Sequence, residues 1–169
     1  MSLLSKSVLA WVACVPAFAC TSVTATNDTR TPMSEASVVF RGTVVERKTL
    51  PLRDDKHTRG RYAIAFRVEE YWKGAPASRI TIYAMDPGTD CMGDGGYEVG
   101  NTYLVFASER EVTDIWLDTH LLFGWADLFP DGTKILFPDT ACTPGGEVSK
   151  AHKALRQLGK GKRPEQRTP

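Results

Sequence analysis

The clearest feature of the sequence is a stretch in which large apolar side chains occupy every second position: Tyr62, Ile64, Phe66 and Val68. Successive side chains of a β-strand point to opposite faces, so this period of two predicts a strand with one buried face. Residues 80–84 repeat the alternation. The continuous apolar run at residues 103–107 is typical of a central strand.

Two further regions predict strands joined by loops. Residues 38–46 are rich in β-branched residues but contain Gly42, and a glycine inside a strand indicates a bulge or a tight bend. The charged residues 47–60 that follow predict a hairpin loop. Residues 115–137 hold two apolar stretches around the turn sequence at 130–133, which predicts another pair of strands.

Short helices are predicted near both ends of this run of strands. Thr31 is expected to cap the first helix and Pro32 to occupy its first position. Four apolar residues follow helical spacing near the C-terminus: Val148, Ala151, Leu155 and Leu158. Gly159 stands where such a helix ends. Residues 86–100 contain five glycines and predict an irregular loop, which includes Cys91.

These elements predict an all-β domain with flanking helices. A bent first strand and several short strands are typical of a small closed or partly open β-barrel, here of five to six strands plus a C-terminal helix. The oligonucleotide/oligosaccharide-binding (OB) barrel is the leading candidate. A chain of 169 residues fits one domain. We place this domain at residues 20–159 and interpret residues 160–169 as a basic flexible tail.

Residues 1–19 have the pattern of a secretory signal peptide. Lys6 precedes an apolar run, and the small residues Ala17 and Ala19 form a cleavage pattern. The apolar run is too short to span a bilayer as a permanent helix. Cleavage after Ala19 would make Cys20 the first mature residue, so we expect a secreted or periplasmic protein.

Three cysteines remain in the expected mature chain, Cys20, Cys91 and Cys142, because Cys14 lies in the signal segment. An extracytoplasmic compartment permits disulfides, and an odd number leaves one cysteine without a partner in the chain. The residues alone leave the pairing open. One alternative is a lipoprotein in which Cys20 is lipidated, and therefore anchored to a membrane, while Cys91 pairs with Cys142.

Composition and motifs exclude several classes of function. Lys and Arg number 21 and Asp and Glu number 20, and a net charge of +1 gives no footprint for nucleic acid or an anionic membrane. His57, His120 and His152 are scattered, without metal-ligand spacing. No hydrolase or phosphate-loop motif is present. We expect a non-enzymatic monomer without a cofactor or a metal of its own.

Several segments together resemble a known family: Cys20–Val23 directly after the cleavage site, Ala36–Val44, Phe66–Gly74, and Gly96–Ala107 following Cys91. In order and spacing they look like the tissue-inhibitor-of-metalloproteinases (TIMP) fold, and they are most similar to bacterial TIMP-like, netrin-module proteins. The Cys142 segment ahead of a closing helix completes the resemblance, which spans about residues 20–159.

The resemblance implies an OB-like barrel and a specific mode of binding. It implies that Cys20 is bridged to Cys91 and that the free α-amino nitrogen and carbonyl oxygen of Cys20 chelate the catalytic zinc of a target metalloprotease. Thr21 would then point to the protease's specificity pocket. The family usually has a second cysteine where this chain has Ser22, which leaves Cys142 without its expected partner. A non-inhibitory interaction module on the same fold is the alternative, since fold does not carry function.

Overall fold

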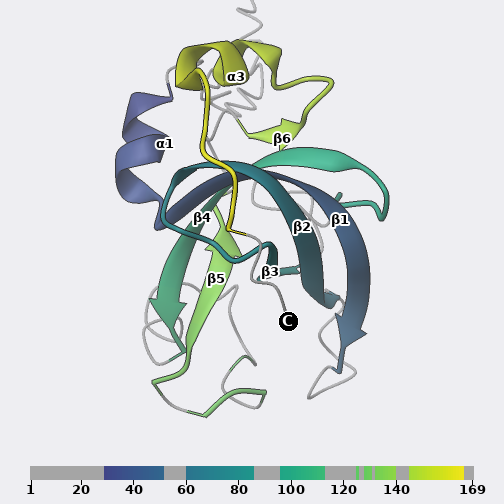
Figure 1. The fold of residues 1–169 in the computed structure, drawn as a ribbon. Helices are drawn as coiled ribbons and strands as arrows, with labels where there is room; N and C mark the ends of the chain where they lie inside the picture. The colour runs from purple at the N-terminus through teal and green to yellow at the C-terminus, as the bar shows by residue number, and fades with distance from the viewer. Residues whose placement is uncertain are drawn as a thin grey trace, which may run out of the picture.

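The computed structural model describes residues 29–51, 60–85, 96–112, 125, 128–130, 132–139 and 145–165 (Figure 1). The elements in chain order are α1 (Arg30–Glu35), β1 (Val38–Leu50), β2 (Arg61–Lys73), β3 (Arg79–Met85), β4 (Thr102–Glu111), β5 (Lys134–Pro138), β6 (Gly146–Glu147) and α3 (His152–Leu158). Neither described helix is long and apolar enough to cross a membrane. The domain is therefore mainly β, with one short helix near each end of the described chain.

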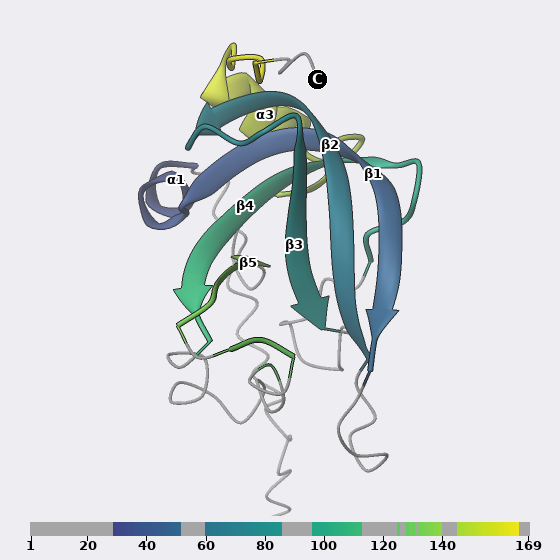
Figure 2. The same ribbon diagram turned by 60° about the horizontal axis from the view of Figure 1, so that its bottom comes forward.

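All strand pairs are antiparallel and form one six-stranded sheet. The order across the sheet is β3-β2-β1-β4-β5, and β6 pairs with the same edge of β4 as β5 does. The strands curve strongly, and α1 and α3 lie at one end of the sheet (Figures 1 and 2). This order makes β1 the partner of both β2 and β4, so the segment that the sequence marks with Gly42 crosses the centre of the sheet.

The central strands are buried on both faces. On the concave side, the side chains of Phe40, Ile64, Phe66 and Ile82 are fully buried in the main core. On the other side, Val39, Leu104 and Phe106 pack against Ala151 and Ala154 at and within α3 and against Met33 of α1. Cover on both faces explains why residues 38–40 and 103–107 are continuous apolar runs rather than alternating ones.

The sheet is not closed into a barrel. Its two outer strands, β3 and β5, approach each other but do not form a ladder in the described chain. Trp125 is 1% exposed and packs against both of these strands. Its ring centroid is 5.7 Å from that of Tyr83 on β3 and 5.3 Å from that of Phe137 on β5. The two outer strands are therefore joined by the packing of aromatic side chains and not by backbone hydrogen bonds of the described chain.

The predicted number of five to six strands and the C-terminal helix are thus confirmed. Of the two forms of barrel that the sequence leaves open, closed or partly open, the closed form is wrong. The predicted strands at 62–68, 80–84 and 103–107 lie within β2, β3 and β4. The hairpin loop predicted at 47–60 starts too early, because β1 continues to Leu50. The two-residue strand β6 was not predicted.

Both helices differ from the prediction at their first turn. Helix α1 begins at Arg30, with Thr29 in the N-cap position, so the prediction that Thr31 caps this helix is wrong. Pro32 is buried within the helix instead of starting it. Helix α3 begins at His152, and its predicted end is confirmed by Gly159, whose φ of 66° favours glycine.

Candidate functional site

The four residues that the sequence analysis places at a binding site or disulfide lie outside the described residues: Cys20, Thr21, Cys91 and Cys142. Their pairing and their role stay predictions. The structure does describe the points at which the flanking chain joins the domain, and it describes a polar cluster on the sheet that the sequence analysis did not identify.

The chain that follows the predicted arm is anchored at Thr29. This residue is 6% exposed. Its backbone N–H donates to Oε1 of Gln157 in α3 at 3.2 Å, and its carbonyl oxygen accepts from the Met33 N–H at 2.9 Å. The two terminal helices are therefore tied together at the base of the segment that contains Cys20.

The chain that follows the glycine-rich loop is fixed at Tyr97. Its ring is buried, 4.9 Å from the Tyr103 ring and 5.4 Å from the Phe66 ring between centroids. The Tyr103 hydroxyl donates to the Gly96 carbonyl oxygen and accepts from the Glu98 N–H, both at 2.9 Å. Gly96, Tyr97 and Glu98 are thus held to the core by ring packing and hydrogen bonds.

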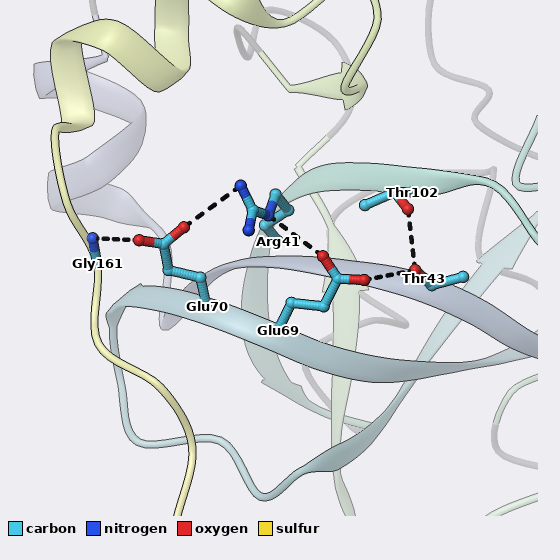
Figure 3. Close-up of polar contacts among 6 residues, drawn as sticks. All are labelled: Arg41, Thr43, Glu69, Glu70, Thr102 and Gly161. Atoms are coloured by element: carbon cyan, nitrogen blue, oxygen red, sulfur yellow. Dashed lines mark hydrogen bonds and ion pairs between the residues drawn. The ribbon is translucent and has the colours of Figure 1, made fainter.

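The polar cluster is positioned by a β-bulge in β2. Arg41 pairs with Glu70 and Gly42 pairs with Val68, so Glu69 is an extra residue on β2. A bulge of this kind re-aims side chains. Glu69 and its neighbour Glu70 both turn toward Arg41 on the outer face, where a regular strand would point them to opposite faces (Figure 3).

Gly42 permits this close approach of β1 and β2. A Cβ atom at this position would lie 2.8 Å from the Arg67 carbonyl oxygen and 3.3 Å from the Phe40 ring. The backbone there leaves no space for a side chain. The bulge or bend predicted from the glycine is confirmed.

The cluster is one continuous network. The guanidinium of Arg41 lies 3.4 Å from Glu69 and 3.5 Å from Glu70, measured from Nε and Nη1 to Oε2 in each case. The Thr43 hydroxyl donates to Glu69 Oε1 at 2.7 Å. This bond uses the only hydrogen of the Thr43 hydroxyl. The Thr102 hydroxyl must therefore be the donor in the 2.9 Å contact between the two threonine hydroxyls.

A strap from the C-terminal segment, residues 159–163, closes the network. The Gly161 N–H donates to Glu70 Oε1 at 2.7 Å (Figure 3). Lys162 and Tyr71 exchange two backbone hydrogen bonds of 2.8 Å. The Trp72 indole Nε1 donates to the Gly159 carbonyl oxygen at 2.9 Å. Residues 160–162 of the predicted tail are therefore held against β2.

Between the strap and the sheet lies a hollow of about 450 Å³. It is lined by three cationic side chains, two carboxylates and one glycine: Arg41, Lys160, Arg163, Glu69, Glu70 and Gly161. Both carboxylates already accept from O–H or N–H donors and face Arg41. Both carboxylates are therefore held in position by donors of the protein itself.

This cluster could not be predicted from the sequence, because the cluster is formed by contacts between residues that are distant in sequence. Arg41 and Glu70 are neighbours only through the sheet, and Gly161 reaches Glu70 from 91 residues away. The available signal was local: alternation in β2 stops at the consecutive acids Glu69 and Glu70, opposite the glycine of β1.

The described residues contain no group of three or more His, Cys, Asp or Glu side chains that could hold a metal ion. Comparisons of the chain with protein-family models, with characterised proteins and with solved structures found no match.

Proposed function

We propose that this chain is an extracytoplasmic, non-enzymatic binding module that presents an N-terminal arm beginning at Cys20, on a TIMP-like variant of the OB fold. The candidate target is the catalytic zinc of a metalloprotease. The proposal is supported by the resemblance of segments along residues 20–159 and by the mainly β fold with terminal helices that such a module would need.

The anchoring of Thr29 carries the proposal. A binding arm gains affinity when its base is fixed, because less conformational entropy is lost on association. The buried Thr29 and its bond to Gln157 supply such a base nine residues after Cys20. A disulfide between Cys20 and Cys91 would fix the other end of the arm.

The chemistry proposed for Cys20 follows from the needs of a catalytic zinc. Such a zinc keeps one coordination position open for water or substrate. A terminal amine and the carbonyl of the same residue form a compact chelate that displaces the water. An α-amino group with an ordinary pKa near 8 keeps a useful neutral fraction at physiological pH. Thr21 would contact the specificity pocket beside the zinc.

The test compares the mature chain with a variant that carries one extra alanine before Cys20. The extension acylates the nitrogen and leaves the sheet unchanged, so inhibition across a panel of zinc proteases should be lost. Substitution of Thr21 by a large residue should instead change which proteases are inhibited. Equal inhibition by the native and extended chains would contradict chelation.

The alternative is a non-inhibitory or lipid-anchored interaction module on the same fold. Intact mass and peptide mapping separate the two. A free N-terminal Cys20 bridged to Cys91 favours the arm, whereas an acylated Cys20 with a bridge between Cys91 and Cys142 favours the lipoprotein. Inhibition by no form of the chain would also leave the non-inhibitory module.

A further inference from the structure

The cationic side chains of the described domain are unevenly distributed. Residues 148–163 contain six Lys or Arg residues and no Asp or Glu, although the whole chain has a net charge of only +1. These six residues are Lys150, Lys153, Arg156, Lys160, Lys162 and Arg163. They lie in α3, in the turn before it and in the strap. The near-neutral total therefore conceals a positive region at one end of the sheet.

Two of these cations flank the hollow and have no anionic partner among the described residues. Lys160 and Arg163 both line the hollow and are exposed. No ion pair joins either of them to a carboxylate of the described chain. Their charges are thus available to a ligand from solvent.

The third cation of the hollow is fixed but incompletely satisfied. Arg41 lies 3.4–3.5 Å from its two carboxylate partners, longer than the roughly 2.7–2.9 Å of a charge-assisted hydrogen bond. Its Nε is buried and has no hydrogen-bond partner. Glu69 and Glu70 therefore position the guanidinium, but they do not use its full capacity to donate hydrogen bonds.

The wall that carries Lys160 and Arg163 is held in place by backbone contacts. A Cβ at Gly161 would lie 2.6 Å from Glu70 Cγ and 2.8 Å from the Tyr71 carbonyl oxygen, so the strap is seated directly on β2. The paired Lys162 lies between the two cations in sequence. The hollow therefore has one wall fixed by the sheet and another fixed by the strap.

We propose that this hollow is a binding site for a phosphate group, held by Lys160 and Arg163 on the strap and by Arg41 on the sheet. This site is independent of the arm at Cys20 and goes beyond the proposed function. Arg41 offsets one of the two carboxylate charges, and the strap adds two positive charges, so the hollow is positive by one. Phosphate monoesters carry about −1.5 to −2 charge and three acceptor oxygens.

The shape of the donor set favours phosphate over a carboxylate. A carboxylate is planar and is best matched by one guanidinium fork, whereas the tetrahedral phosphate accepts from cations that approach from several directions. Here the cations come from two separate walls of the hollow. The phosphate group could belong to inorganic phosphate or to a lipid headgroup.

The first experiment titrates the full mature chain with inorganic phosphate and follows backbone amide shifts by NMR, with chloride added to keep the ionic strength constant. The Lys160 and Gly161 amides should shift in a saturable manner. The double substitution Lys160→Gln and Arg163→Gln should weaken binding about tenfold or more, since it removes two charged donors.

The matched control is the double substitution Lys153→Gln and Arg156→Gln, which removes the same charge from exposed positions on α3 outside the hollow. It should weaken binding by less than about twofold, as expected for distant screened charges. Equal weakening by the two double variants would show a diffuse field and would overturn the proposal.

The second experiment separates the two sources of phosphate. The same variants are tested for sedimentation with vesicles of phosphatidylcholine, with and without phosphatidic acid, whose headgroup is a phosphate monoester. A lipid headgroup is supported as the ligand if the chain sediments with the anionic vesicles and only the double substitution of Lys160 and Arg163 abolishes this binding. A soluble ligand is supported if inorganic phosphate shifts the amides in a saturable manner and the chain does not sediment with the vesicles. Failure of both would overturn the site, while the arm at Cys20 would still be tested by the protease panel.

Discussion

The two halves of β2 belong to one strand but are built differently. Residues 61–67 pair without interruption with β3, and their large apolar side chains alternate into the core. The pairing with β3 ends after a bond from the Val68 N–H to the Ser78 carbonyl oxygen. Beyond it, β2 contains the bulge at Glu69 and is paired at Tyr71 by the strap.

Because of this difference, the first half of β2 contributes mainly to the stability of the domain and the second half mainly to the placement of charged side chains. A regular ladder sends every second side chain inward, so its first half contributes buried apolar area. The bulged half gives up that regularity and gathers Glu69 and Glu70 on one face, where Arg41 and the strap meet them. Substitutions in the two halves should therefore differ in size and in the property that they change.

The largest effect is expected in the regular half, at Phe66. This side chain is 0% exposed and makes edge contacts with the rings of Phe40, Tyr97 and Tyr103. Phe66→Ala should lower the free energy of unfolding by about 3–5 kcal/mol, because it removes the buried ring and leaves a cavity. Urea denaturation measures the change. The control Val45→Ala, at an exposed position, should cost less than about 0.5 kcal/mol.

In the bulged half, a methyl group on Gly161 should have the next largest effect. Gly161→Ala places a Cβ against Glu70 and the Tyr71 backbone, so the strap must lift away from β2. The cost should be about 1–2 kcal/mol, limited by the hydrogen bonds that the strap contributes. Thermal unfolding measures it. Gly96→Ala is the control, since nothing lies within 4 Å of its Cβ; equal losses at the two sites would contradict the seating of the strap.

A smaller effect is expected for the network itself. Thr43→Val keeps the size of the side chain but removes the hydroxyl that donates to Glu69 and accepts from Thr102. The free energy of unfolding should fall by about 1 kcal/mol. The same substitution at Thr49, an exposed residue of the same strand, should have no measurable effect. A loss at Thr49 as large as that at Thr43 would show that the hydroxyl network is not the cause.

The smallest effect is expected for a group of exposed ion pairs that joins β1 to β3 across the regular half of β2. Glu46 on β1 lies 2.9 Å from the Lys48 ammonium and 2.5 Å from Arg79 on β3. The hydrogen bond and charge of Lys48, followed by the charge of Arg79, lower the pKa of the Glu46 carboxyl. A lowered pKa contributes stability above the ordinary glutamate pKa, and this contribution is lost as the pH falls through the lowered value.

Glu46→Gln should therefore lower the Tm slightly at neutral pH, and the two proteins should converge as the solution is acidified below the lowered pKa. Added salt should also shrink the difference, because the groups are exposed. Thermal scans across pH at two salt concentrations measure both effects. A difference that grows in acid would contradict the direction of the pKa shift.

The sequence predicts the regular half of β2 and fails at the bulged half for a physical reason. Burial on one face imposes a period of two, and this period is visible at Tyr62, Ile64, Phe66 and Val68. Gly42 predicts the irregularity but not which residue of the partner strand is extra. That choice depends on the register between β1 and β2, which only the folded sheet defines.

The choice between a closed and a partly open barrel could not be made from the sequence for a similar reason. The pattern predicts how many strands form, but closure depends on whether the two outer strands pair, and β3 and β5 form no ladder in the described chain. The contacts of the strap were missed because a basic segment with glycine and proline has the composition of a solvated end. The predictions for Cys20, Thr21, Cys91 and Cys142 concern residues outside the described part and stay predictions.

The backbone pairing between the strap and β2 is limited to one residue pair in the described chain, and this has a consequence for hydrogen exchange. The Lys162 and Tyr71 amides are protected by two backbone bonds to each other, and no neighbouring pair of described residues extends this pairing into a ladder. Lifting the strap exposes both amides without disturbing the apolar residues under β2. These two amides should therefore exchange through a local opening, at rates independent of low denaturant concentrations, while the Ile64 and Phe66 amides exchange only when the whole sheet unfolds.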